Sequence, residues 1–446
     1  MLRKVLLPML LVTVSVTASG EWHNYIIDDY GYSATIDLYS SGLPIVVYSR
    51  YSPGVKYATF DGASWTTDTL FIIEYGSCIQ TSVVVDDEDV PHVSFAPPGV
   101  TRYGCMDSTG EWVIEALPPE CLDIWNSIAL DPDGNPCISF YNCTSDDLWL
   151  ACRDETEWVT GTVDSEGDTG DCNSLAIDAE GVVHIAYCRY SPDPGVRYAM
   201  RDLNSQWHLE TVDTAMSSDP SGTSLVLDPF GNPCISYTAS GELRYAAWDG
   251  SSWNVETVYA MDTGPSIYGT SLAMDQFGYP HIVHCSPNAD YLLYSVDQGA
   301  GWQTDSIAEL YGESAGDPDL VLDELGRPHI IYESWDDDRN LRYVYSDEPS
   351  GIAPGTSGEG PLSLVAGPVP FQGRVRFLCT VPEGEEFTLR VFDLSGRLVR
   401  DIPSGTPGAG QYQFFWQPDA SVPPGQYMVV LQTATDRAAR KVIHLR

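Results

Sequence analysis

Short apolar stretches alternate with turn residues along most of the chain, and one such pattern occurs seven times. Each copy has an apolar stretch that ends at an anchor residue, then a turn that is mostly rich in Asp, Pro and Gly, and then a second apolar stretch. Two apolar stretches joined by such a turn are typical of a β-hairpin. The copies read TIDLYSSGLPIVVY, SVVVDDEDVPHVSF, SIALDPDGNPCISF, SLAIDAEGVVHIAY, SLVLDPFGNPCISY, SLAMDQFGYPHIVH and DLVLDELGRPHIIY.

The period of this pattern leaves room for four strands in each unit. Successive anchors are 45 to 50 residues apart, at Tyr39, Asp86, Asp131, Asp178, Asp228, Asp275 and Asp323. In the first six units the fourth strand is expected to begin at a tryptophan, namely Trp65, Trp112, Trp158, Trp207, Trp253 and Trp302. Repeats of about 40 to 50 residues with four short strands are typical of the blades of a β-propeller.

The seventh unit has no tryptophan strand, but a matching segment precedes the first unit. This segment, EWHNYII, contains Trp22. We expect it to complete the last blade and to close the ring, which leaves no exposed inner sheet edge. The predicted fold class is therefore all-β, with a seven-bladed β-propeller over residues 21–348 that is closed by its N-terminal strand.

One turn of the repeat resembles a known signature. The segment Ser295 to Trp302, SVDQGAGW, matches the Asp-box pattern S-x-D-x-G-x-x-W, and DGASW, DGSSW and DSTGEW are relaxed versions. The propeller region is thus similar to sialidase-like propellers in architecture. This resemblance implies a structural turn between the third and fourth strands, and it does not specify an activity.

A different module follows a linker rich in Pro, Gly and Ser at residues 349–361. Alternating apolar residues over residues 362–446 predict a small Ig-like β-sandwich. The segments LRVFDLSGRLVRDI, PPGQYMVVL and RKVIHLR resemble the C-terminal sorting domains of type IX secretion substrates and the Ig-like domain of the flagellar hook-capping protein. The resemblance implies that secretion or attachment machinery is a partner; the alternative is a purely structural module.

The N-terminus and the charge of the chain indicate where it acts. Residues 1–20, MLRKVLLPMLLVTVSVTASG, read as a signal peptide cut after Gly20, and no later segment is long and apolar enough for a transmembrane helix. The net charge of −41 disfavours nucleic acid as a partner. We therefore expect a protein that is secreted, extracellular or attached to a bacterial outer surface.

The residue that begins the second apolar stretch, directly after the recurring turn, is histidine or cysteine in six units, and both residue types can bind metal ions. The seven units have Ile45, His92, Cys137, His184, Cys234, His281 and His329 at this position. Equivalent positions in a ring cannot converge on one ion, so we expect these side chains to pack between blades and to bond backbone groups. The same argument disfavours disulfides between equivalent cysteines. It leaves Cys143 with Cys172 or with Cys121 as the predicted pairing, and it predicts no metal cofactor at this position.

Connections from the second to the third strand and from the fourth strand to the next unit lie on one face, which we call the variable-loop face. Variable loops on a rigid scaffold are where binding residues usually occur. The candidate ligand-binding residues are Tyr51, Trp125, Tyr190, Tyr291, Trp335 and Asp336. The segment DSEGDTGD offers a possible Ca²⁺ site at Asp164, Glu166, Asp168 and Asp171, or else a solvated loop.

These features favour a non-enzymatic binding protein whose ligand is a carbohydrate or a protein. A carbohydrate-active enzyme, such as a sialidase-like glycoside hydrolase or a lyase, is the alternative, because acidic residues are abundant on the loops. The chain lacks the N-terminal arginine motif of sialidases. It also shows neither a Ser-His-Asp elbow nor a phosphate loop. A purely structural surface protein is a third possibility.

Overall fold

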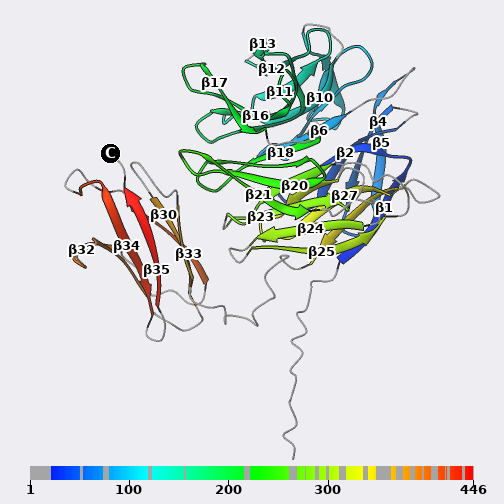
Figure 1. Cartoon of the computed structure of the whole chain (residues 1–446). Helices are drawn as coiled ribbons and strands as arrows, with labels where there is room; N and C mark the ends of the chain where they lie inside the picture. The colour runs from blue at the N-terminus through cyan, green and yellow to red at the C-terminus, as the bar shows by residue number, and fades with distance from the viewer. Residues whose placement is uncertain are drawn as a thin grey trace, which may run out of the picture.

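The computed structural model describes residues 22–50, 54–73, 80–118, 123–154, 157–214, 221–260, 269–276, 278–286, 291–297, 301–310, 318–334, 340–347, 363–367, 375–381, 387–393, 396–402, 410–416, 418, 422–433 and 437–444. The regular elements of these residues are all β-strands, in antiparallel sheets (Figure 1). The all-β prediction is therefore confirmed. In the described part of the chain, none of the elements is a helix that could span a membrane.

Residues Trp22–Ser346 form seven four-stranded sheets. The first three sheets contain β2 (Tyr32–Leu38), β3 (Pro44–Ser49), β4 (Gly54–Phe60) and β5 (Trp65–Ile72); β6 (Thr81–Val85), β7 (Pro91–Phe95), β8 (Arg102–Met106) and β9 (Trp112–Ala116); and β10 (Asp123–Leu130), β11 (Pro136–Asn142), β12 (Asp147–Arg153) and β13 (Trp158–Asp164). The next three contain β14 (Asp168–Ile177), β15 (Val183–Ser191), β16 (Gly195–Arg201) and β17 (Trp207–Asp213); β18 (Ser221–Leu227), β19 (Pro233–Ala239), β20 (Glu242–Trp248) and β21 (Trp253–Ala260); and β22 (Thr270–Met274), β23 (Pro280–Cys285), β24 (Tyr291–Asp297) and β25 (Trp302–Glu309).

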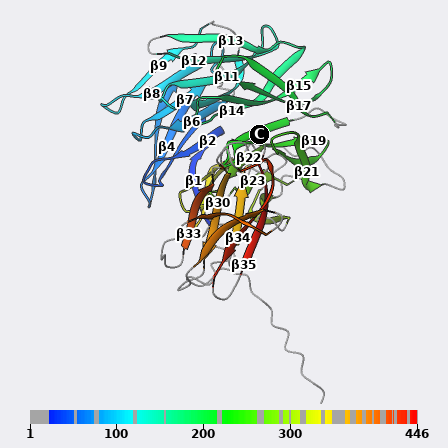
Figure 2. The same ribbon diagram turned by 90° about the vertical axis from the view of Figure 1, so that its left-hand side faces the viewer.

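The last sheet joins the two ends of this region. It contains β26 (Asp319–Leu322), β27 (Pro328–Ser334) and β28 (Asn340–Ser346), and β1 (Trp22–Asp29) pairs with β28 as its outer strand. The predicted place of the Trp22 segment is therefore confirmed. The first strand of each sheet contacts the first strand of the next, and β26 contacts β2, so the sheets form a closed ring. Figure 2 shows β2 and β22 near its centre and β9 and β13 at its rim.

The turn between the first and second strands is fixed by its aspartate. In the β18–β19 turn, the Asp228 carboxylate accepts the N–H groups of Phe230 and Asn232, both at 2.8 Å. The Gly231 N–H donates to the Asp228 carbonyl at 2.9 Å, and Gly231 has a φ of 81°, which glycine adopts without a steric penalty. The anchor column of the repeat is therefore explained by side-chain acceptors in this turn.

In six of the seven sheets, the tryptophan that begins the fourth strand packs against the preceding sheet. Trp112 of β9 packs edge-to-face on Tyr57 of the preceding sheet, with ring centroids 5.5 Å apart. Trp22, Trp65, Trp158, Trp253 and Trp302 make the same contact with third-strand tyrosines of their preceding sheets. Such aromatic pairs contribute about 0.5–1.5 kcal/mol each beyond their burial.

The C-terminal strands form a second β-structure with its own core. One sheet contains β29 (Ser363–Gly367), β30 (Val375–Val381) and β33 (Gly410–Trp416); the other contains β32 (Leu398–Ile402), β31 (Thr388–Asp393), β34 (Gly425–Gln432) and β35 (Arg437–His444). Buried residues of both sheets, including Phe377, Leu389 and Val429, form one hydrophobic cluster. This region is a two-sheet antiparallel structure.

Candidate functional site

A cavity of about 230 Å³ lies where the first strands of the seven sheets meet. Its lining residues come from the beginnings of these strands, for example Thr35 of β2, Asn126 of β10 and Thr223 of β18. Each first strand begins after the connection from the preceding sheet. The cavity therefore lies toward the variable-loop face, where the sequence predicts binding.

A ring of hydrogen bonds joins the first strands around the cavity. In five sheets a serine hydroxyl accepts a backbone N–H from the next sheet at 3.0–3.2 Å, and these residues are Ser82, Ser127, Ser174, Ser224 and Ser271. Asp319 takes the equivalent place on β26 and accepts the Ile36 N–H at 3.0 Å. Thr35 takes it on β2, and its buried hydroxyl has no hydrogen-bond partner among the described residues.

Asp319 is the carboxylate of this cavity. It accepts the Ser271 hydroxyl at 2.7 Å in addition to the Ile36 N–H. Burial raises its pKa, while the donated hydrogen bonds from Ile36, Ser271 and Leu320 act in the opposite direction. The lining otherwise consists of uncharged residues in the described part of the chain.

The strands around the cavity are bulged at its rim. Positive φ values occur at equivalent positions in β2, β10 and β14 and at two glycines: Ser33 (47°), Trp125 (56°), Cys172 (48°), Gly222 (65°) and Gly269 (65°). The ladder register shifts at the same points of β2, β10, β14 and β18. Non-glycine residues rarely adopt this conformation, and bulges of this kind are common beside functional sites.

Hydrogen bonds from the next sheet hold these bulges in place. The Asn173 side-chain amide donates to the Trp125 carbonyl at 2.8 Å, and the Thr81 hydroxyl donates to the Ser33 carbonyl at 2.6 Å. The Ser33 N–H in turn donates to the Glu333 carboxylate at 2.7 Å. The rim of the cavity is therefore preorganised by contacts that run between sheets.

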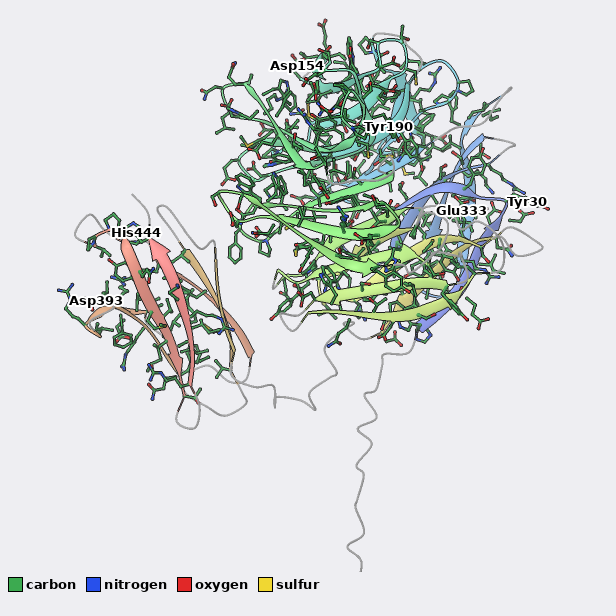
Figure 3. All side chains as sticks on the ribbon, in the orientation of Figure 1. Tyr30, Asp154, Tyr190, Glu333, Asp393 and His444 are labelled. Atoms are coloured by element: carbon green, nitrogen blue, oxygen red, sulfur yellow. A yellow bond between two sulfur atoms is a disulfide. The ribbon has the colours of Figure 1, made fainter. Side chains whose placement is uncertain are left out.

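The structure brings two of the predicted binding residues to this region. Trp125 lines the cavity directly. Tyr190, at the end of β15 (Figure 3), bonds Asp171, whose neighbour Cys172 also lines the cavity. Tyr291 begins β24, is 44% exposed and is not among the lining residues. The remaining predicted binding residues, Tyr51, Trp335 and Asp336, lie outside the described residues.

The predicted calcium ligands bond separate protein partners. Asp164 accepts the Tyr187 hydroxyl at 2.7 Å, and Glu166 lies 3.5 Å from Arg189. Asp168 accepts the Tyr141 hydroxyl at 2.9 Å. For Asp171, burial raises the pKa, and the hydrogen bonds from Tyr190 and the Cys172 N–H lower it. Among the described residues no three acidic, His or Cys side chains are placed to hold a metal ion.

Three equivalent ionic clusters connect neighbouring sheets on the variable-loop face. Each joins an aspartate on the outer strand of one sheet to a second-strand tyrosine and a third-strand cation of the next sheet. In one of them, Asp213 accepts the Tyr237 hydroxyl at 2.7 Å and pairs with Arg244 at 2.6 Å. The others are Asp28 with Tyr48 and Lys56, and Asp164 with Tyr187 and Arg197.

The recurring His/Cys position has a structural role in the described sheets. His281 contacts the Tyr294 hydroxyl through Nδ1 and lies 3.6 Å from Asp275 through Nε2, and His92, His184 and His329 repeat this arrangement. The predicted backbone partner of the imidazole was therefore wrong, because a tyrosine of the adjacent strand supplies the hydroxyl.

The predicted disulfide pairing of Cys143 with Cys172 was also wrong. The disulfide joins Cys137, at the His/Cys position, to Cys152 directly opposite it on β12. The alternative partner, Cys121, lies outside the described residues. The prediction failed because it compared only cysteines in loops and cysteines at equivalent positions of different units. It did not consider two cysteines that face each other on neighbouring strands of one sheet.

Acidification is expected to weaken the fold through His329. Burial lowers the pKa of His329 to about 4, Asp323 opposes this effect and Arg327 adds to it. The pKa of His329 is lower in the folded chain than in the unfolded one. The contribution of neutral His329 to the free energy of unfolding is therefore fully present above about pH 6.5 and is lost as the pH falls toward 4. We expect His329→Gln to reduce this loss by about 2 kcal/mol, measured by urea unfolding at neutral pH and near pH 4. The exposed His208 provides the control, and an unchanged pH dependence in His329→Gln would contradict the prediction.

Comparison with known proteins defines the fold. No protein-family model matches the chain, and a search of curated proteins finds no match. Among solved structures, the chain is similar to a PL25 ulvan lyase bound to -[GlcA(1-4)Rha3S]- (TM-score 0.55, 12% identity, covering 73% of this chain and 96% of that one). It is also similar to the BP39L lectin from Burkholderia pseudomallei (TM-score 0.55, 8% identity, covering 72% and 96%).

A further similar structure is the K499G mutant of NanB sialidase from Streptococcus pneumoniae, with a TM-score of 0.44 and 12% identity, covering 72% of this chain and 70% of that one. The neighbours with a TM-score above 0.5 include a lectin and a carbohydrate-active lyase. At these identities the likeness shows the fold alone, and this fold is a β-propeller.

Proposed function

We propose that the chain is an exported, non-enzymatic carbohydrate-binding protein built on a seven-bladed β-propeller over residues 21–348. Its ligand binds on the variable-loop face, over the central cavity. The observation that supports this most strongly is the preorganised rim, where Trp125 lines the cavity and Tyr190 lies beside it. An aromatic side chain beside polar groups in a concave site suits a ligand with both apolar faces and hydroxyls.

The binding interpretation is supported by how the neighbouring ionic groups are used. Asp28, Asp164 and Asp213 each accept a tyrosine hydroxyl and form an ion pair with a cation, so these carboxylates are engaged in joining sheets. A general acid or base must reach a substrate proton with a suitable pKa. These three aspartates therefore favour a scaffold role over a catalytic one.

A carbohydrate-active enzyme remains the second candidate because of one contact. The Tyr141 hydroxyl lies 3.0 Å from Asp146 and 2.9 Å from Asp168, so two carboxylates share one phenol on the variable-loop face. Paired carboxylates at short range are the catalytic groups of most glycosidases. A glycan array combined with a hydrolysis and lyase screen of residues 21–446 distinguishes the two functions, since binding without product formation supports the lectin.

Trp125→Gly is expected to weaken glycan binding by at least about tenfold, because the variant loses the aromatic contact. Glycine is chosen because Gly222 and Gly269 occupy equivalent bulges with positive φ, so the backbone is preserved. Isothermal titration measures the effect. Tyr291→Ala serves as the control, because Tyr291 is exposed away from the cavity lining. Equal losses in both variants would contradict a site at the cavity.

We further propose that residues 1–20 are a signal peptide and that the 349–361 linker precedes a C-terminal Ig-like domain, residues 362–446, which engages secretion or attachment machinery. The support is the two-sheet structure with a separate core, together with the sequence resemblance. Fractionation of cells that express the chain with and without residues 362–446 tests this. The shortened chain is expected to remain inside the cell envelope.

A further inference from the structure

The charge of the central cavity restricts the ligand that it can hold. Asp319 is the only carboxylate among the described lining residues, and none of these residues is Lys, Arg or His. The groups that bond Asp319 are a serine hydroxyl and backbone N–H groups, which are uncharged. Whether Asp319 is ionised or protonated, the described lining residues present no positive charge to a ligand.

Four described cations on the variable-loop face already have partners. Lys56, Arg197 and Arg244 form ion pairs with the aspartates of the three inter-sheet clusters. Arg102, at the start of β8, lies over the Phe71 ring with its guanidinium carbon 4.9 Å from the centroid. A carboxylate or sulfate group entering the cavity would therefore face Asp319 without a cation among the described lining residues to offset the repulsion.

Uncharged hydroxyls suit this lining better than anions. The Thr35 hydroxyl is buried and has no partner among the described residues, so it can donate to or accept from a ligand hydroxyl. The apolar face of a sugar ring can pack on Trp125. The volume of about 230 Å³ is below the 300–1,000 Å³ that is usual for drug-sized ligands, so it suits one terminal sugar.

We propose that the cavity binds the end of an uncharged glycan and discriminates against glycans that carry carboxylate or sulfate groups. This inference rests on the proposed carbohydrate-binding function and specifies its ligand class. The first strands of the sheets, which line the cavity, set this preference for uncharged glycans, and Asp319 is the residue that determines it.

The test is isothermal titration of residues 21–446 with a neutral oligosaccharide found on the glycan array and with its carboxylated and sulfated counterparts. We expect the charged forms to bind at least about tenfold more weakly. Tighter binding of a charged form, especially if Arg102→Gln abolishes it, overturns this inference and leaves the carbohydrate-binding function intact. Binding of no glycan at all overturns the proposed function, and the inference with it.

The variant that tests Asp319 is Asp319→Ser, which restores the residue found at five equivalent positions and keeps an acceptor for the Ile36 N–H. The ratio of neutral to charged affinity is expected to fall about tenfold. Asp228→Asn is the control, because Asp228 is a turn carboxylate that accepts the Asn232 N–H at 2.8 Å and does not line the cavity. An equal change in both variants, or in neither, overturns the role of Asp319.

A second variant keeps the proposal testable if Asp319→Ser fails to fold. Thr35→Val removes the unpartnered hydroxyl with little change in shape, and it is expected to weaken neutral-glycan binding about fivefold. Unchanged affinity in this variant would place the ligand outside the cavity and would contradict the inference.

Discussion

Asp213→Ala is expected to destabilise the propeller by about 3 kcal/mol in urea unfolding. Asp213 accepts the Tyr237 hydroxyl at 2.7 Å and pairs with Arg244 at 2.6 Å, and its side chain is 9% exposed. Its removal leaves a largely buried guanidinium without that partner and a buried phenol without its acceptor. Because the three residues come from two sheets, the variant also weakens the contact between those sheets.

Two further variants separate these contributions. Tyr237→Phe removes one hydrogen bond and keeps the ion pair, so its expected cost is about 1 kcal/mol. Asp401→Ala removes the partner of Arg390 in an exposed pair, with side chains 42% and 56% exposed, and its expected cost is below about 1 kcal/mol. A cost for Asp213→Ala that does not exceed that of Asp401→Ala would show that the cluster does not stabilise the ring.

The repeat allowed the ring to be predicted because side chains of equivalent type recur at equivalent places. The first column of the aligned pattern illustrates this point. It is serine in five units, and these serines accept the N–H groups that join the first strands. Thr35 and Asp319 are its exceptions, and all seven residues of the column line the cavity. The repeat therefore brings these residues together, while the two exceptions give the cavity an unpartnered hydroxyl and a carboxylate.

Other features of the site depend on geometry that the repeat does not encode. Trp125 and Cys172 adopt positive φ in bulges, which glycines mark at Gly222 and Gly269 but which no local pattern marks at a tryptophan. Asp164 and Asp168 lie near each other in sequence, yet they bond Tyr187 and Tyr141 of different sheets. Contacts between sheets decided these arrangements, and a calcium-like spacing along the chain gave no information about them.

The disulfide occupies the one sheet in which a histidine at the recurring position would lack its usual partner. His92, His184, His281 and His329 each contact a tyrosine hydroxyl on the adjacent third strand. In the β10–β13 sheet the position of that tyrosine, two residues before Cys152, is Leu150, which cannot donate a hydrogen bond. Cys137 and Cys152 instead join the second and third strands covalently.

Cys137→Ala/Cys152→Ala is expected to lower the free energy of unfolding by about 3 kcal/mol, because the bond closes a loop across a sequence separation of 15. Cys234→Ala, at the equivalent position of the β18–β21 sheet, is the control and is expected to cost less, since Cys234 forms no disulfide. The triple variant Cys137→His/Leu150→Tyr/Cys152→Ala installs the arrangement of the other sheets beside Asp131. It should recover part of the lost free energy of unfolding in urea. A stability equal to or below that of the double alanine variant would show that the histidine–tyrosine contact cannot replace the disulfide in this sheet.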